Sequence, residues 1–340
     1  MYRINEKNLL SYNCFYSALA FFLGQYDQGY SPLIINNRWQ LFFKEGEDYS
    51  DDRRFIGEHP LPYDSRHLYE LRKLLGIEVE IRKAIRGMAD IDACLREDKR
   101  AFLFVNRFCY DNKPHARDEK CVTTICLQDR KGDQFFYRNF DLNLEGNRWV
   151  SREDLVYSWE QASEFEILNR AHIRMQADRQ AISPARVCSA FIRMMKDSLY
   201  HYLQGDHSEG YSYGNQAFNL FIRNIGEWNS KDYQRFVDCS MYMNIILRQR
   251  QFIQKALRQF SLQTGISGFR EQELAHMIDL WDRLKTVLFL MGMRKQTEAV
   301  SGLREQIREI RDREYEYAAF LYEKMDALNH GDIKTDGDSG

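Results

Sequence analysis

Cys14 is the side chain of this sequence best placed to act as a nucleophile. It follows Asn13, a residue type that caps helix N-termini well, and the pattern predicts a short helix that ends before Gly24. The apolar positions of this helix fall at helical spacing: Phe15, Leu19, Phe22 and Leu23. The positive end of a helix dipole favours the thiolate form of a cysteine. Cys14 is therefore a candidate catalytic thiol, and the alternative is a small buried apolar residue.

A thiol enzyme of the papain type needs a base later in the chain, on a sheet strand or on the loop before it. The strand predicted at residues 121–128 has Glu119, Lys120 and Cys121 at its start, where a histidine is expected. The nearest histidine is His115, in a polar loop. His115 is the candidate base, and Lys120 is a weaker substitute because only strong desolvation lowers the pKa of a lysine enough.

The orienting group of such a site comes from the next strand, predicted at residues 134–141. Asp141 ends that strand and can hold the base through a carboxylate. Asn139 is the second choice and would do the same through an amide. The predicted catalytic set is therefore Cys14, His115, and Asp141 or Asn139.

The elements that must position these groups lie in the first half of the chain. Residues 65–75 and 88–98 predict amphipathic helices, and residues 33–43 fit either a strand or a buried loop. Strands are predicted at 77–81, 101–108, 121–128 and 134–141, the last two forming a hairpin with a five-residue connection. We expect an α+β domain, residues 1–150, with a mainly antiparallel sheet and the Cys14 helix packed against it.

The second half of the chain predicts helices almost throughout. Ser151 with Asp154 and the pair Ser183-Pro184 are N-terminal helix signals. Helices are expected at 151–161, from 183 onward, and at 215–228, 231–260, 270–291 and 295–328. We expect residues 151–330 to form an all-α domain and residues 331–340 to form a disordered tail. The heptad-like face of the last helix is compatible with a homodimer.

The stretch NCFYSALAFFLGQYDQ…NNRWQLFF resembles the opening of the butirosin biosynthesis protein H family. The likeness continues through VNRFCYDNKPH…CVTTICLQDRKGDQFFYRNFD. Three later stretches are similar to the all-helical domain of that family: YSYGNQAFNLFIRNIGEW, SMYMNIILRQRQFIQKALRQF and MIDLWDRLKTVLFLMG. The resemblance covers most of residues 8–328 as a pattern of spacing.

The resemblance implies a papain-like N-terminal domain followed by an all-helical domain. It implies a nucleophile at Cys14 and a carboxylate at Asp141, with Asn139 as second choice. The histidine of the family falls at Lys120 or Cys121 and does not carry over. Members occur with antibiotic and peptide biosynthesis, and the founding member moves an acyl group from an acyl carrier protein to an amine. The implied partners are an acyl or peptidyl carrier protein and a small-molecule amine or alcohol acceptor.

Composition limits the other classes of function. The chain has 340 residues, a net charge of −2 and 29% charged residues, which disfavours nucleic acid as the main partner. No signal peptide and no run of about 18 apolar residues is present, and the seven scattered cysteines predict reduced thiols. We therefore expect a cytoplasmic protein that does not interact with membranes.

Other residue types predict neither a cofactor nor a metal. The glycines form no nucleotide-binding motif, and His172, His201, His207 and His276 lack metal-ligand spacing. His67 is expected to serve packing. The arginines of the helical half suggest solvated helix faces, and as an alternative a contact with an acidic carrier protein through Arg248, Arg250 or Arg294.

Two hypotheses of different classes follow. The first is a cysteine-dependent acyltransferase or related thioester-handling enzyme acting through an acyl-enzyme on Cys14, with a thiol hydrolase as a variant. The second is a catalytically degenerate protein that keeps the fold as a carrier-protein or substrate-binding scaffold. The cysteine at a helix start favours the enzyme, and the missing histidine at residues 120–121 favours the scaffold.

Overall fold

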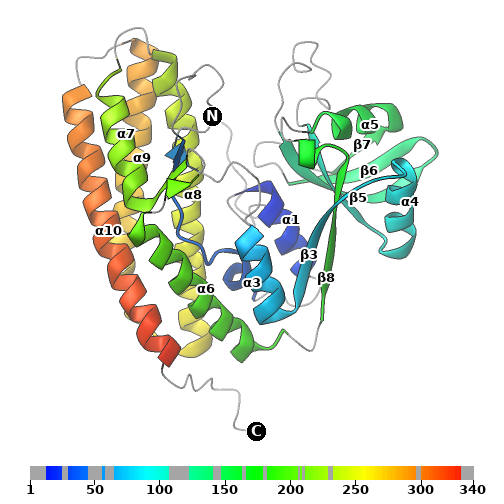
Figure 1. The fold of residues 1–340 in the computed structure, drawn as a ribbon, viewed down its shortest axis with the longest axis horizontal. Coiled ribbons are helices and arrows are strands. Elements are labelled where there is room, and N and C mark those ends of the chain that lie inside the picture. Colours follow the sequence, from blue (N-terminus) through cyan, green and yellow to red (C-terminus); the bar gives the residue numbers. More distant parts are fainter. Residues whose placement is uncertain are drawn as a thin grey trace. The chain divides into compact units, whose positions relative to one another are not determined.

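A computed structural model gives a mixed α/β protein with an antiparallel sheet (Figure 1). It describes residues 13–24, 30–44, 56–57, 65–106, 122–140, 147–162, 166–178, 182–205, 207–208, 211–228, 233–295 and 300–330. The chain forms two compact units. Unit 1 contains Met1–Ser31 and Pro62–Ile182, and unit 2 contains Pro32–Leu61 and Ser183–Gly340.

Unit 1 is built on a six-stranded sheet in the order β3-β8-β4-β5-β6-β7, and all neighbouring strands are antiparallel. The strands are β3 (Ile77–Lys83), β4 (Ala101–Asn106), β5 (Val122–Lys131), β6 (Gln134–Asn139), β7 (Asn147–Ser151) and β8 (Ala171–Ala177). The helices are α1 (Cys14–Leu23), α3 (Ser65–Leu75), α4 (Met88–Glu97) and α5 (Arg152–Glu160), with a short 3₁₀ turn at Glu166–Leu168.

The two faces of this sheet carry different helices. Leu103 and Val105 of β4 belong to a buried cluster with Ile91 of α4 and Trp159 of α5. Phe104 points to the other face, because side chains alternate along a strand, and its ring stacks on Phe15 of α1. The sheet of unit 1 is therefore covered by α1 on one face and by α4 and α5 on the other.

Unit 2 is mainly helical. Its helices are α6 (Pro184–Gln204), α7 (Gly214–Ile225), α8 (Tyr233–Thr264), α9 (Glu271–Arg294) and α10 (Val300–His330). The short helix α2 (Ser31–Ile35) leads into the part of unit 2 that precedes them in the chain. A small antiparallel sheet adds β1 (Phe42–Lys44), β2 (Ile56–Gly57), β9 (His207–Ser208) and β10 (Tyr211–Tyr213), in the order β2-β1-β10-β9.

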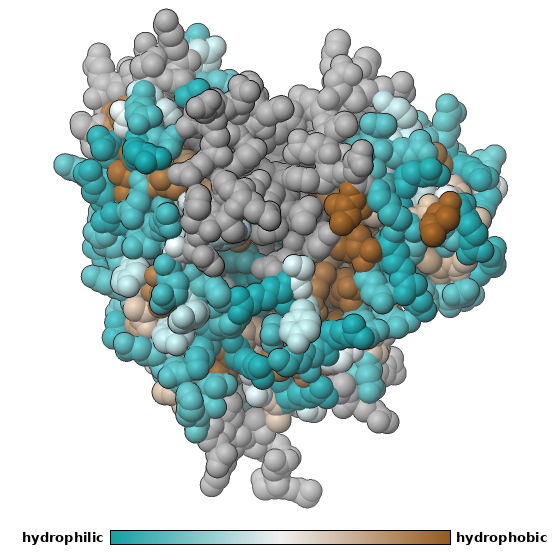
Figure 2. Space-filling view, viewed as in Figure 1, coloured by the Kyte–Doolittle hydropathy of each residue, from teal (hydrophilic) through white to brown (hydrophobic). Residues whose placement is uncertain are grey.

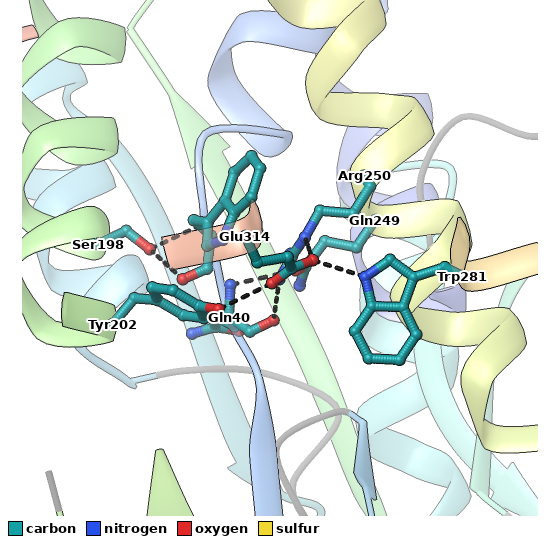
Figure 3. A network of polar contacts seen from close by, with 8 residues as sticks. Gln40, Ser198, Tyr202, Gln249, Arg250, Trp281 and Glu314 are labelled. Atoms are coloured by element: carbon teal, nitrogen blue, oxygen red, sulfur yellow. Dashed lines mark hydrogen bonds and ion pairs between the residues drawn. The ribbon is translucent and has the colours of Figure 1, made fainter. Parts of the chain in front are cut away.

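A buried polar network joins the early segment of unit 2 to its helices (Figure 3). Arg250 of α8 and Glu314 of α10 are both fully buried, and the guanidinium donates two hydrogen bonds to the carboxylate, at 2.8 and 2.9 Å. Trp281 Nε1 and the Tyr202 hydroxyl donate to the same carboxylate at 2.7 and 2.8 Å. Arg250 also donates to the backbone oxygen of Gln40 at 3.2 Å.

The burial of Arg250 corrects the expectation that it contacts a carrier protein. Its guanidinium lies 4.1 Å from the ring centre of Trp39 and is paired with Glu314, so no charge reaches the surface. The exposed face visible in Figure 2 is mostly hydrophilic, with small hydrophobic areas between the polar ones. Most of the large apolar side chains are instead buried in the two units, with exceptions such as Ile85 and Leu262.

Several expected elements are confirmed, with small shifts at their ends. The helix at 65–75 has those bounds, and the signals at Ser151 and Ser183 mark true caps, because each hydroxyl accepts from the backbone N–H three residues later. The hairpin is tighter than expected, since β5 extends to Lys131 and leaves two residues before β6. Residues 33–43 contain the end of α2, a largely buried loop at 36–41 and the start of β1, so the expectation of a buried loop is confirmed for the middle of this stretch.

The expected domain limits differ from the two units. The first unit extends to Ile182 instead of residue 150, because β8 pairs with β3 and β4 and so completes the sheet of unit 1. Residues 151–330 are therefore not all-α, and unit 2 also contains β9 and β10. The segment Pro32–Leu61 belongs to unit 2, where β1 pairs with β10. The tail expected at 331–340 lies outside the described residues.

Candidate functional site

Cys14 is the first residue of α1 and is half-buried. Asn13 caps the helix as expected, and its Oδ1 accepts a hydrogen bond from the Tyr16 N–H at 2.9 Å. The helix is apolar on almost every side and is buried in unit 1. The first turn of an α-helix directs N–H groups out of its N-terminus, so the Cys14 thiol lies where positive potential is concentrated.

The first turn of α1 lies over the start of β5. The Phe15 ring is 6.0 Å from that of Phe104, which is the register partner of Thr124 near the start of β5. Two turns further along the helix, the Phe21 ring lies 5.5 Å from that of Phe140, just past β6. These contacts confirm that the Cys14 helix packs against the sheet, with the end that carries Cys14 near β4 and its last turn near the end of β6.

Asn139 does not face Cys14. It is paired with Ile125, which belongs to the buried cluster under α4 and α5. Its neighbours Arg138 and Phe140 both contact Phe21 of α1, so they occupy the opposite face. Because side chains alternate along a strand, Asn139 points away from α1. Asn139 therefore lies on the face of the sheet opposite to α1, and its role as the orienting group stays a prediction.

The other two predicted partners, His115 and Asp141, lie outside the described residues. The described residues next to these segments are Val122, which follows the segment with His115, and Phe140, which precedes Asp141. Phe140 donates its N–H to the Thr124 oxygen at 3.3 Å, so the chain leaves β6 beside the start of β5. The segment that contains His115 enters β5 at Val122. Phe140 itself lies beside the last turn of α1, where its ring is 5.5 Å from that of Phe21.

His67 of α3 is the histidine that contacts α1 within the described residues, and it serves packing as expected. It is buried, and its Nδ1 lies 3.1 Å from the Tyr16 hydroxyl. Successive helical residues are turned by about 100°, so Tyr16 is on the opposite side of α1 from Cys14. His67 therefore contacts the wrong side of the helix to act on the Cys14 thiol.

The other described cysteines are held as thiols. Burial raises the pKa of Cys126 to about 12 and that of Cys188 to about 11, and it raises the pKa of Cys239 well above its usual range. Cys94 is half-buried like Cys14, but burial and then the nearby Asp98 and Glu97 raise its pKa. Cys94 is thus the natural internal reference for the reactivity of Cys14.

Two arginines that the sequence reasoning did not single out lie on the α1 face of the sheet. The guanidinium carbon of Arg138 is 4.6 Å from the centre of the Phe21 ring, and that of Arg100 is 5.1 Å from it. Because side chains alternate between the two faces along β4 and β6, the pairing of these strands places both arginines on the α1 face. The positions of Arg100 and Arg138 in the sequence carry this information, but it can be used only when the pairing register of the strands is known.

No protein-family model matches the sequence, and no curated protein is significantly similar to it. The likeness to the butirosin biosynthesis protein H family therefore depends on the spacing of the residues quoted above. In the part of the chain that the structure describes, no group of three or more His, Cys, Asp or Glu side chains could hold a metal ion. None of the described helices has both the length and the apolar character to cross a membrane.

Proposed function

We propose that this protein is a cysteine-dependent acyltransferase or a related thioester-handling enzyme that forms an acyl-enzyme on Cys14. The observation that carries the proposal is the half-buried thiol at the first residue of α1, with the first turn of that helix over the start of β5. Papain-type chemistry needs a base that reaches the nucleophile from a nearby strand or from the loop before it, and the position of Cys14 supports the proposal on that ground.

The proposed reaction has two steps. The Cys14 thiolate attacks the carbonyl carbon of an acyl or peptidyl carrier-protein thioester, and the carrier thiol leaves with a proton. An amine or alcohol then attacks the acyl-enzyme and returns the thiol of Cys14. Backbone N–H groups at the start of α1 are suited to stabilise the oxyanion of each tetrahedral intermediate. His115 is the proposed base, with Asp141 as the group that orients it.

The finer assignment of the fold belongs to the same proposal. Unit 1 is proposed to be papain-like, because a buried helix with an N-terminal cysteine packs on a mainly antiparallel sheet. The mainly helical unit 2 is proposed to correspond to the helical domain of the butirosin biosynthesis protein H family. Its small sheet, formed by β2, β1, β10 and β9, is a departure from an all-helical domain.

The experiment is an acylation assay in which a small thioester replaces the unidentified carrier protein. The protein is incubated at pH 7 with an N-acetylcysteamine thioester, and the acylated residue is mapped by mass spectrometry. We expect acylation of Cys14, its loss in Cys14→Ser and its persistence in the matched variant Cys94→Ser. In His115→Ala we expect acylation to slow at least tenfold. Acylation of Cys14 no faster than that of Cys94 contradicts the proposal.

The second candidate function is a non-catalytic scaffold that binds a carrier protein or a substrate. Two observations favour it: Glu119, Lys120 and Cys121 stand where a histidine is expected, and Asn139 points away from α1. The same assay separates the two candidates. Slow, equal labelling of Cys14 and Cys94, together with unchanged labelling in His115→Ala, supports the scaffold.

A further inference from the structure

Arg100 and Arg138 converge on one aromatic ring in unit 1. Arg138 belongs to β6, and Arg100 stands just before β4, so the two approach the α1 face from either side of β5. Each guanidinium carbon lies about 5 Å from the Phe21 ring centre, so the two charges are at most about 10 Å apart. All three side chains are half-buried, which leaves them partly open to solvent.

Neither arginine has an acidic partner among the described residues. The guanidinium groups lie near aromatic rings, Arg100 near Phe21 and Arg138 near both Phe21 and Phe140, and an aromatic ring is not a conventional acceptor for their N–H groups. The Nη1 atom of Arg100 is buried and lacks a hydrogen-bond acceptor. A buried donor of a charged group without an acceptor is costly, so this arrangement calls for a negatively charged ligand.

The nearby thiol does not supply that charge. Cys126 lies in β5, in register with Phe102 on one side and Arg138 on the other. Burial raises its pKa to about 12, although both arginines act to lower it, so the thiol stays neutral. Two positive charges therefore share this face of the sheet, and neither is in an ion pair with a described acidic side chain; the carboxylate of β5 on this face, Asp129, is in register with Phe136 and not with Arg138.

We propose that Arg100 and Arg138, on either side of β5, form a binding site for a phosphate-type oxyanion. A phosphate monoester carries about −1.5 to −2 charges at pH 7 and several acceptor oxygens, which matches two guanidinium groups. Phe21 lies two helical turns from Cys14, about 10 Å along α1. Ser17 and Ala18, between them, are buried, so the site is separate from the candidate nucleophile.

Calorimetric titration of the full chain with inorganic phosphate in a chloride buffer tests the proposal directly. We expect saturable binding that weakens at least tenfold in Arg100→Gln and in Arg138→Gln. Arg130→Gln is the matched control, because that arginine of β5 is already paired with Asp92 at 2.8 Å. Its affinity should remain within twofold of the unmodified protein. A titration with phosphoethanolamine shows whether the site prefers a phosphate ester or the free ion.

Chemical protection tests the site without a variant that could fail to fold. Phenylglyoxal modifies arginine side chains, and phosphate should protect Arg100 and Arg138 but not Arg130. Three results would overturn the proposal: no saturable heat, unchanged phosphate affinity in both Arg100→Gln and Arg138→Gln, or equal protection of the two arginines by chloride at the same ionic strength. Failure here leaves the acyl-transfer proposal standing, since the thioester assay measures only labelling of Cys14.

Discussion

Glu314→Gln is the substitution expected to weaken unit 2 most strongly for the smallest change in shape. It replaces a carboxylate by an amide of nearly equal volume at the centre of the network in Figure 3. The carboxylate accepts four hydrogen bonds, two from Arg250 and one each from Trp281 and Tyr202. The substitution removes the carboxylate that is paired with a guanidinium whose side chain is 0% exposed.

The magnitude follows from the donors on each oxygen. Oε1 accepts from Arg250 Nε and Trp281 Nε1, and Oε2 accepts from Arg250 Nη2 and the Tyr202 hydroxyl. Whichever oxygen becomes an NH₂ group, it meets an Arg250 N–H that cannot turn into an acceptor. Removing one partner of a buried ion pair costs about 3–5 kcal/mol, because the other charge stays buried and unpaired.

The assay must measure the unfolding of unit 2 separately from that of unit 1, since the two units can unfold in separate transitions. Urea unfolding followed by hydrogen exchange of the α8 and α10 peptides meets this need. Tyr202→Phe is the control, because it removes one donor and leaves the ion pair intact. We expect a loss of about 1.5 kcal/mol in the control. A Glu314→Gln protein within 1 kcal/mol of the control would refute the reasoning, since the buried charge would then have found another partner.

Two further predictions concern backbone strain and pH. Gly214→Ala should lower the free energy of unfolding by more than about 3 kcal/mol, because Gly214 has φ +58° and a Cβ there would lie 1.9 Å from the backbone oxygen of Tyr202. Gly132 has the same φ but no atom within 4 Å of such a Cβ, so Gly132→Ala should lower it by only about 1–2 kcal/mol in the same denaturation assay. Burial lowers the pKa of His172, and the charge of Asp90 opposes this shift only in part. As the pH drops, this histidine therefore binds a proton at a higher pH in the unfolded chain than in the folded protein, and the free energy of unfolding falls below about pH 6.5. Urea midpoints of unit 1 between pH 7.5 and 5 should therefore fall less in His172→Gln, and an equal fall in both proteins would contradict the role of this histidine.

The helices were predictable because their signals are local. The spacing of Leu71 and Leu75 fixed the buried side of α3, and the Ser183-Pro184 pair fixed the start of α6. Caps and amphipathic periodicity involve residues within a few positions of each other. The same holds for the tight turn around Gly132, although the length of β5 was underestimated.

The sheet partners were less predictable because they depend on distant segments. The strand β8 lies in the half that predicted helices, and its partner β3 precedes the whole central part of the sheet in the chain. Its place is fixed in part by tertiary contacts, such as the hydrogen bond from Trp159 Nε1 to the Ala171 oxygen at 2.8 Å. The segment Pro32–Leu61 likewise joins unit 2 through pairing of β1 with β10.

Register also decides which polar residues of β6 belong with α1. A single step along a strand moves a side chain to the other face of the sheet. Asn139, an attractive orienting group by its position in the sequence, is paired with Ile125 and so lies with the α4 and α5 core. Arg138, one residue earlier, lies on the α1 face beside Phe21. The spacing of a candidate triad is therefore insufficient evidence in an antiparallel sheet. The same alternation that turns Asn139 away from α1 places Arg138 and Arg100 on the α1 face.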